Sequence, residues 1–354
     1  MGDALVGCLL GTAVGDSIGL CCEGLSRQRQ ARLCPEIAGH RFLFHRGMVS
    51  DDTEHTCMTA QALLAAGGEP AAFATVLAWR LRFWLLGLPA GIGFGTLRAI
   101  LKLWLGFPPH RSGVHSAGNG PAMRSAIIGV GYGGDGDVLH ELIRASTRIT
   151  HTDPRAECGA LAVALAAYLS GSRLGATIAP DEYLRQLSAL LAGKHEAEEL
   201  LPLVRAAAES VCAGQTTEAF AEQLGLADGV SGYIYHTVPV ALQCWLRHQA
   251  DYRSGILAIV RCGGDTDTTA AIVGGIIGAG VGKAGIPQDW LDGLWEWPRS
   301  VEWMERLGRA VAESRTLGTS QQAPPLPRWG LAVRNVVFLL AVLAHGVRRL
   351  FPPY

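Results

Sequence analysis

Apolar and polar positions along the chain follow the spacing of helices rather than that of strands. The clearest segments are rich in Ala and Leu, have acids or Pro near their starts, and in several cases end at Gly. These segments are residues 71–88, 157–169, 181–193 and 199–214. The most strand-like run, residues 232–246, contains Pro239 and continues in an Ala-Leu pattern, which favours a helix that begins after Gly232. Because alternating runs of Val, Ile and Thr are almost absent, the pattern predicts an all-α protein.

Glycine is unusually common for a helical chain, with 45 residues. A glycine in a helix interior costs about 1 kcal/mol of stability relative to Ala. This many glycines in a helical chain therefore indicate positions where close packing requires them. Some of them recur every four residues in two stripes that adjoin acidic residues: Gly7, Gly11, Gly15 and Gly19 near one end, and Gly274, Gly278 and Gly282 near the other. We infer that glycine-faced helices pack tightly at the centre and bring together acids from distant parts of the chain.

The composition narrows the class of protein. The chain has 354 residues, of which 49% are hydrophobic and 17% charged, with a formal net charge of -1. This length is enough for an extensive core. No long basic run is present, so a nucleic-acid partner is not predicted. The nine cysteines are an odd number without a CxxC pair. They indicate reduced thiols in a cytoplasmic protein rather than a disulfide framework or a zinc site.

The two ends of the chain lack clear targeting segments. The N-terminus has no positive leading region and carries Asp3 and Asp16, which argues against a signal peptide. Near the C-terminus only residues 336–344 run without a polar side chain. A bilayer span needs roughly 20 apolar residues, so stable membrane insertion is not expected. A packed terminal helix is favoured; the alternative is contact with a membrane surface through flanking arginines, Arg334, Arg348 and Arg349.

The expected organisation is one catalytic domain over residues 1–317 and a connector over residues 318–330. An apolar helix packed on the domain would follow over residues 331–354. Nothing in the pattern indicates an oligomeric state.

Two short acidic segments carry the candidate chemistry. In the first, Ser50 or Asp51 can cap a helix that ends at Gly67 and Gly68. If Asp51 is the cap, Glu54 completes a capping box, and the acids then have a purely structural explanation. In the alternative, Asp51 and Asp52 bind a cation.

The second acidic segment follows Gly263 and Gly264 and opens an apolar, glycine-rich run. An ordinary N-cap at Asp265 is again the structural alternative. However, Asp265, Asp267 and Thr268 offer three oxygens from one helix start, and few Lys or Arg residues are near in sequence. Burying such carboxylates without counter-charge costs several kcal/mol.

Two acidic helix starts that face each other would form a dinuclear metal site. Their donors are carboxylate and hydroxyl oxygens, with no His or Cys at ligand spacing. Oxygen donors select Mg²⁺, Mn²⁺ or Ca²⁺ over softer ions.

Five motifs, in their order along residues 7–285, resemble the ADP-ribosylglycohydrolases, the family of dinitrogenase reductase-activating glycohydrolase. They are GCLLGTAVGDSIGLCCEG, SDDTEHT, GNGPAMR, THTDPRA and GGDTDTTAAIVGG. The resemblance implies a compact all-α bundle around a binuclear centre of two Mg²⁺ or Mn²⁺ ions. It also implies that the partner is an ADP-ribosylated protein or a small ADP-ribose conjugate.

The resemblance assigns the metal ligands and the catalytic acids. The ligands would be Ser50, Asp51, Asp52, Asp265, Asp267 and Thr268, with Glu23 as a mobile ligand or gate. Hydrolysis would proceed through an oxocarbenium-like state, with the ions holding the distal ribose hydroxyls and activating a water. Glu23, Asp51 and Asp52 would be the catalytic residues, and Asp52 or Glu23 would accept the proton of the water.

The same resemblance assigns an ADP-ribose pocket. Its members would be Gly91, Gly93, Ser116, Gly118, Asn119, Gly120, Met123, His151 and Tyr233. The glycines would let backbone N–H groups approach phosphate oxygens, with His151 beside the distal ribose and Tyr233 stacked on adenine. Without the family context, Asn119 and Gly120 read equally well as a plain turn, and a lone histidine is more often structural.

The acceptor is indicated less clearly. Arginine-directed members often carry Asp-Ile-Gly where this chain has Gly91-Ile92-Gly93, which is closer to the serine-directed branch. That branch in turn has an aromatic residue where this chain has Ala117. ADP-ribosyl-arginine is slightly favoured over the O-linked substrates ADP-ribosyl-serine and O-acetyl-ADP-ribose. The rival classes are a non-catalytic ADP-ribose-binding relative and a metal-dependent hydrolase of the pyrophosphate.

Overall fold

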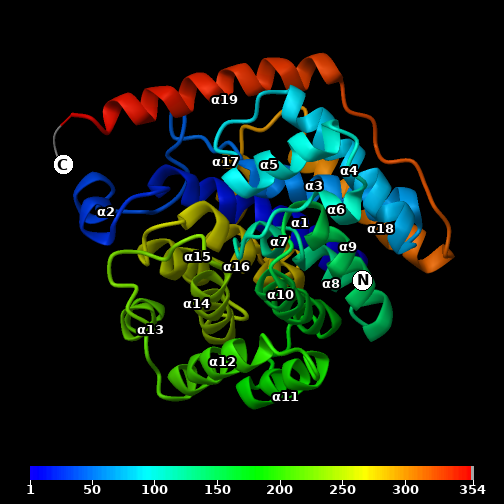
Figure 1. Ribbon diagram of the computed structural model, residues 1–354. Helices are drawn as coiled ribbons and strands as arrows, with labels where there is room; N and C mark the ends of the chain where they lie inside the picture. The colour runs from blue at the N-terminus through cyan, green and yellow to red at the C-terminus, as the bar shows by residue number, and fades with distance from the viewer. Residues whose placement is uncertain (352–354) are drawn as a thin grey trace.

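The computed structural model describes residues 1–351, which form α-helices and short 3₁₀ turns; this part of the chain contains only isolated β-bridges and no strand (Figure 1). The all-α prediction is confirmed. The elements are α1 (Gly2–Gly19), η1 (Leu20–Cys22), α2 (Arg27–Leu33), α3 (Asp51–Ala66), α4 (Pro70–Leu86), α5 (Phe94–Trp104), α6 (Pro109–Ser112), α7 (Gly120–Met123), α8 (Ala126–Tyr132), α9 (Gly136–Thr150), α10 (Pro154–Ser172), α11 (Pro180–Leu190), α12 (Ala197–Cys212), α13 (Thr217–Gln223), α14 (Ile234–Arg247), α15 (Tyr252–Arg261), α16 (Thr266–Val281), η2 (Lys283–Gly285), α17 (Gln288–Gly293), α18 (Val301–Leu317) and α19 (Arg328–Arg348).

The two glycine stripes meet at the centre of the molecule, between α1 and α16. A methyl group added to Gly11 would lie 2.2 Å from the carbonyl oxygen of Gly274, and one added to Gly7 would lie 2.1 Å from that of Gly278. Only a hydrogen fits at such positions, so the two backbones touch directly. Both helices are almost completely buried. The inferred packing of glycine-faced helices is therefore confirmed.

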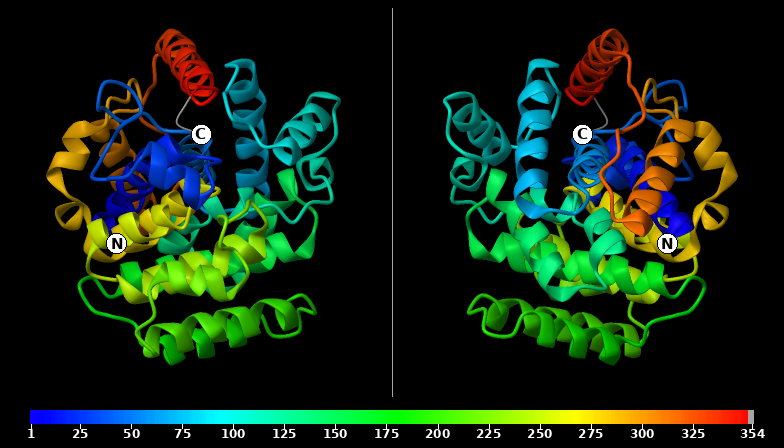
Figure 2. Two further views of the ribbon diagram at one scale, coloured as in Figure 1. Left: turned by 90° about the vertical axis from the view of Figure 1, so that its left-hand side faces the viewer. Right: turned by 90° about the vertical axis from the view of Figure 1, so that its right-hand side faces the viewer.

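The remaining helices surround this pair. α3, α8 and α18 pack against α1, whereas α10, α14 and α15 pack against α16. α11 and α12 form an outer layer at one end of the molecule, and α19 lies across the opposite end (Figures 1 and 2). At the starts of α3 and α16 most side chains are buried, whereas Asp51 and Asp265 are partly exposed.

The predicted helices are present with small shifts at their ends. α14 begins at Ile234, with Tyr233 as its N-cap, and α3 ends at Ala66, followed by the C-cap Gly67 in the left-handed conformation with φ 59°. α19 begins at Arg328, so the segment between α18 and α19 is residues 318–327.

Within residues 1–351, two helices are long and apolar enough to cross a membrane by length and composition alone. The first, Gly2–Cys22, is completely buried inside the bundle, whereas only 28% of the apolar window of α19 is buried. The central helix is thereby explained as core, and the outer face of α19 needs a separate account.

Candidate metal centre

Three segments distant in sequence converge at one end of α16. Glu23 follows η1, and the backbone beside it is paired with the start of α16: Gly24 N–H donates to the Gly264 carbonyl at 2.9 Å, and Gly264 N–H donates to the Leu25 carbonyl at 2.8 Å. From the other side, Asp265 N–H donates to the Val230 carbonyl at 2.7 Å. These bonds fix Glu23 next to the second acidic segment.

The two acidic helix starts face each other, as predicted. The Thr268 hydroxyl donates to Asp52 Oδ2 at 3.2 Å, across 216 residues of sequence. The carboxylates form two overlapping groups, Asp16–Asp52–Asp267 and Glu23–Asp265–Asp267, and the oxygens within each group lie within 4.8 Å of one another. Asp267 belongs to both groups, which is the arrangement expected of a carboxylate that bridges two cations.

Ser50 is the N-cap of α3, because its side chain accepts a hydrogen bond from Asp52 N–H at 3.3 Å. The alternative with Asp51 as the cap and Glu54 in a capping box is therefore wrong. Asp265 occupies the N-cap position of α16, but its side chain caps no N–H of that helix. Instead, Asp265 Oδ2 accepts from Asn119 Nδ2 at 2.7 Å. The N-cap explanation thus fails for Asp265, and its carboxylate is free to bind a cation.

Glu54 has a different role from the neighbouring acids. It forms buried ion pairs with Arg299 at 2.6 Å and Arg334 at 3.4 Å, and it accepts a hydrogen bond from the indole of Trp84. Burial alone would raise the pKa of Glu54, but the two guanidinium charges outweigh it and place that pKa below its usual value. The sequence suggested few arginines nearby; Arg299 and Arg334 are instead brought from the C-terminal part of the chain.

Asp16 is a residue of the site whose role the sequence reasoning missed. Its carboxylate accepts hydrogen bonds from Ser50 N–H at 3.0 Å, from Thr53 N–H at 3.1 Å and from the Thr53 hydroxyl at 2.5 Å. Burial raises its pKa to about 6 in spite of these bonds. Asp16 therefore anchors the start of α3 to α1. The only signal in the sequence was an acid within the first glycine stripe.

The remaining carboxylates lack counter-charge. Burial, and then the neighbouring carboxylates, raise the pKa of Asp52 and of Asp267 well above the usual value, and burial raises that of Glu23. Among the described residues, Asp52 Oδ1 and Glu23 Oε2 are buried without a hydrogen-bond partner. Orphaned oxygens in an all-oxygen donor set fit hard divalent cations such as Mg²⁺ or Mn²⁺. Asp51 is half-buried beside these groups but belongs to neither, so its role as a ligand stays a prediction.

The GNG loop lies next to this centre. Asn119 N–H donates to the Gly232 carbonyl at 3.0 Å, and its side-chain amide bridges Thr237 at 3.0 Å and Asp265. Gly118 pairs with Tyr233, the half-buried N-cap residue of α14. The loop is therefore tied to both α14 and the acidic segment, which is more than a plain turn requires.

Small residues surround the side chain of His151. A methyl group added to Gly118 or Gly120 would lie 3.0 or 3.1 Å from its imidazole ring, and one added to Gly95 would lie 3.4 Å from it. The ring is buried, with Nδ1 2.8 Å from the Thr150 hydroxyl. Burial, with a smaller effect of Arg124, lowers the pKa of His151 to about 3, so the imidazole is neutral.

The other predicted pocket residues lie at different depths. Ser116 is half-buried beside Gly118, whereas Gly91 and Gly93 lie in the exposed loop before α5. Met123 is in the hydrophobic core, and its carbonyl accepts from the Thr56 hydroxyl at 3.1 Å. Ser116, Gly118, Gly120 and His151 thus share one neighbourhood, whereas no contact places Gly91 and Gly93 in it.

Comparisons with known proteins agree with this architecture. The family model for ADP-ribosylglycohydrolase matches residues 2–321. An uncharacterized protein from Archaeoglobus fulgidus is 33% identical over 317 residues, which cover 86% of this chain and 95% of that protein. ADP-ribosyl-[dinitrogen reductase] glycohydrolase from Rhodospirillum rubrum is 27% identical, covering 82% of this chain and 90% of its own. A solved structure described as an ADP-ribosylglycohydrolase-related protein complex has a TM-score of 0.60 at 27% identity and covers 89% of this chain and 98% of its own. The chain therefore belongs to the ADP-ribosylglycohydrolase family of hydrolases.

Proposed function

We propose that this enzyme removes ADP-ribose from modified protein side chains and that its activity depends on two Mg²⁺ or Mn²⁺ ions. The observation that carries the proposal is that two clusters of acidic residues share Asp267. Within these clusters, buried oxygens of Asp52 and Glu23 have no hydrogen-bond partner. A protein that had lost catalysis and kept only ADP-ribose binding would have no need of this uncompensated charge. The similarity to a glycohydrolase of ADP-ribosylated dinitrogen reductase supports a modified protein as the substrate.

The side chains have separable tasks in this proposal. Bound divalent ions would supply the positive charge that holds the ribose hydroxyls and lowers the pKa of a water. Asp52 or Glu23, each with an unpartnered oxygen, would accept the proton of the attacking water as the glycosidic bond breaks. Asp16 keeps the start of α3 in place, and Asn119 orients Asp265. The neutral His151 can hydrogen-bond a ribose hydroxyl without adding charge.

ADP-ribosyl-arginine is the favoured acceptor. Glu23, Asp51 and Asp265 are the partly exposed acids of the centre, so its open side presents negative charge. Such a surface attracts a cationic guanidinium more than a neutral serine side chain or an acetyl ester. The loop at Gly91 to Gly93 resembles the serine-directed branch, which keeps O-linked substrates as the alternative.

The test offers the purified protein arginine- and serine-ADP-ribosylated peptides side by side, with Mg²⁺, Mn²⁺ or EDTA. We expect release of ADP-ribose with either ion, faster from arginine, and none with EDTA. Asp51→Ala and Asp267→Ala variants that remain folded should be inactive. Wild-type rates in those variants, or AMP in place of ADP-ribose as the product, would contradict the proposal.

A further inference from the structure

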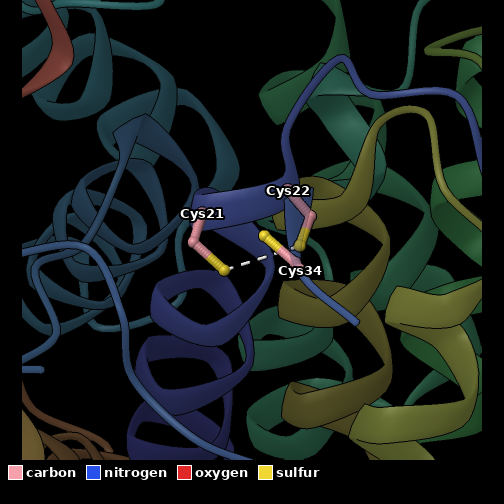
Figure 3. A group of neighbouring side chains, drawn as sticks. All are labelled: Cys21, Cys22 and Cys34. Atoms are coloured by element: carbon pink, nitrogen blue, oxygen red, sulfur yellow. Dashed lines mark hydrogen bonds between the residues drawn. The ribbon is translucent and has the colours of Figure 1, made fainter. Parts of the chain in front are cut away.

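Three cysteines outside the carboxylate centre converge beside Glu23. Cys21 and Cys22 are the last residues of η1, and Cys34 is the residue that ends α2 (Figure 3). Their sulfur atoms lie within 4.8 Å of one another, and the Cys21 and Cys22 sulfurs are 3.5 Å apart. The sequence alone gave no sign of this cluster, because the spacing is not that of a CxxC pair.

These separations suit a metal ion better than a disulfide. A disulfide needs sulfur atoms about 2.05 Å apart. Sulfurs that bind one tetrahedral Zn²⁺ at about 2.3 Å lie roughly 3.8 Å from each other, a value inside the observed range. Cys21 and Cys22 are buried, whereas Cys34 is half-buried and lines a cavity of about 860 Å³ beside α2 and α13. An ion can therefore enter from that cavity, and a fourth ligand can come from the same side.

We propose that Cys21, Cys22 and Cys34 bind one thiophilic divalent cation, such as Zn²⁺, at a site separate from the carboxylate centre. The bound ion would link the end of α2 to the backbone directly before Glu23. It would also fix the start of the segment from Cys34 to Ser50, which has no regular helix and leads into the first acidic segment. The expected role is to brace the two chain segments that carry Glu23 and Asp52.

The test titrates Cd²⁺ into the full-length reduced protein in saturating Mg²⁺, so that the oxygen site is already filled. We expect a sulfur-to-cadmium absorption band that saturates at one equivalent, together with protection of Cys34 from alkylation. Cys34→Ser should weaken Cd²⁺ binding at least 100-fold, whereas Cys212→Ser, which removes an exposed cysteine elsewhere, should leave it unchanged. The proposal is overturned if the band persists in Cys34→Ser, if no band forms at one equivalent, or if peptide mapping finds Cys34 in a disulfide.

A second, independent feature is the distribution of exposed large hydrophobic side chains. Of the 24 such residues in the described chain, 18 lie in two segments, residues 79–107 and 329–351. Between residues 108 and 294, by contrast, only Leu174 is of this kind. The first segment forms α4 and α5, and the second forms α19 and the residues after it.

The two segments share one end of the molecule (Figure 2). Asn335 of α19 donates to the Gly87 carbonyl at the end of α4 at 2.8 Å. The exposed Trp79 and Phe83 stack with ring centroids 5.9 Å apart, and Phe83 meets Trp104 of α5 edge-on at 6.3 Å. α4, α5 and α19 therefore present one broad apolar and aromatic surface, which we name the α4–α5–α19 face.

The same segments contain no acidic residue. No Asp or Glu occurs between Glu69 and Asp135, and none follows Glu313. Basic residues are interleaved with the aromatic ones, as in Lys102 over the ring of Phe107 at 5.2 Å. Aromatic, aliphatic and cationic side chains without acids are the composition of a surface that binds anionic lipid headgroups.

We infer that the α4–α5–α19 face binds the surface of an anionic membrane, with α19 lying in the plane of the interface. A spanning orientation is excluded by Arg334, which lies on the inner side of α19 in buried ion pairs with Glu54 and Glu296. α19 also begins after residue 321, where the family match ends, so this helix, unlike α4 and α5, lies outside the part of the chain that the family model covers.

The test is flotation of the full-length protein with phosphatidylglycerol-containing vesicles and with purely zwitterionic ones. We expect binding to the anionic vesicles only, weakened by added salt. Val336→Glu, at an exposed site of α19, should weaken this binding at least tenfold, whereas Leu174→Glu, at an exposed site in the turn after α10, should not. The inference is overturned if neither vesicle binds, if Val336→Glu binds like the wild type, or if sedimentation shows a dimer that Val336→Glu dissociates.

Discussion

Asp267 is the residue shared by both carboxylate groups, so its replacement separates the metal hypothesis from a structural role. In Asp267→Asn a neutral amide replaces a buried carboxylate whose pKa is raised by burial and by Glu23. Without divalent ions we expect the variant to melt at a higher temperature than the wild type, because an uncompensated charge is gone. With Mg²⁺ it should gain no further stability, and its rate of ADP-ribose release should fall at least about 100-fold.

Calorimetry with and without Mg²⁺, together with the release assay, measures both effects. Asp137→Asn, at an exposed acid in the first turn of α9, is the matched control and should behave like the wild type. An Mg²⁺-dependent rise in melting temperature that survives in Asp267→Asn would refute the shared-ligand assignment.

His151 contributes a pH dependence of known sign. Its pKa is lowered to about 3 in the folded protein, against about 6.5 when unfolded, so the unfolded chain binds one more proton between these values. Above pH 6.5 His151 is neutral in both states and does not lower the free energy of unfolding. As the pH falls below 6.5, the extra proton on the unfolded chain lowers the free energy of unfolding by up to about 1.4 kcal/mol per pH unit. His151→Gln removes the titration, so its free energy of unfolding should fall less steeply.

Urea unfolding of both proteins between about pH 7 and pH 5, in EDTA, gives the comparison. His55, whose pKa burial also lowers, is present in both proteins and is not removed by the substitution. Parallel stability curves would show that His151 titrates normally in the folded state.

The sequence predicted the positions of the candidate ligands better than it predicted their neighbours. Ser50, Asp52, Asp265 and Asp267 belong to short segments at helix starts, and such local patterns can be seen in a single chain. The partners of Glu54 could not be found in this way, because Arg299 and Arg334 are 245 and 280 residues away. Long-range ion pairs leave no periodic trace in the sequence.

At the scale of elements, the helices were predictable because their Ala- and Leu-rich runs have acids or Pro near their starts and, in several cases, Gly at their ends. The ends of helices were less predictable. α19 begins at Arg328 rather than at residue 331, because a proline such as Pro327 can stand directly before the first turn of a helix as well as inside a connecting segment. The contact between α1 and α16 was predictable for another reason. A four-residue glycine repeat has a direct steric meaning, whereas the pairing of most other helices depends on side-chain shapes.

The α1–α16 contact gives the clearest stability prediction. In Gly11→Ala the new methyl group would lie 2.2 Å from the Gly274 carbonyl oxygen, so the two backbones must separate. We expect a loss of about 3 kcal/mol or more in the free energy of unfolding. Gly346→Ala, in the exposed part of α19 with no atom near the new methyl group, should instead gain about 0.5–1 kcal/mol.

Denaturant unfolding at constant Mg²⁺ measures both variants. Since Gly11 and Gly346 both lie inside helices, the difference between them isolates the steric contact from helix propensity. Equal effects at the two positions would mean that α1 and α16 are farther apart than described.

At the scale of the whole molecule, α19 is joined to the candidate metal centre by buried charge. Arg334 contacts Glu296 at 2.7 Å and Glu54 at 3.4 Å, and its guanidinium also donates to the Val49 carbonyl, next to Ser50. Arg334→Met would leave a buried acid short of a partner, at an expected cost of about 3–5 kcal/mol of stability. Arg328→Met, at an exposed position of the same helix, should change stability by less than about 0.5 kcal/mol.

Thermal unfolding of the two arginine variants distinguishes a docked α19 from one that only rests on the surface. If Arg334→Met were as stable as Arg328→Met, the terminal helix would contribute nothing to the order of the first acidic segment.

The divalent ions proposed here would connect segments more than 200 residues apart, so their binding should stabilise the fold as a whole. A ligand at 100 times its Kd adds about 2.7 kcal/mol to the free energy of unfolding.

Protons compete with the ions, because burial raises the pKa of Asp52, Asp267 and Glu23 when no cation neutralises them. As the pH rises, the apo protein loses the stability that came from those protons, while the ions bind more tightly. The increase in melting temperature on adding Mg²⁺ should therefore be larger near pH 8 than near pH 5.5, and absent in Asp267→Asn at both. An increase that is independent of pH would place the bound Mg²⁺ on surface carboxylates of ordinary pKa rather than at the buried centre.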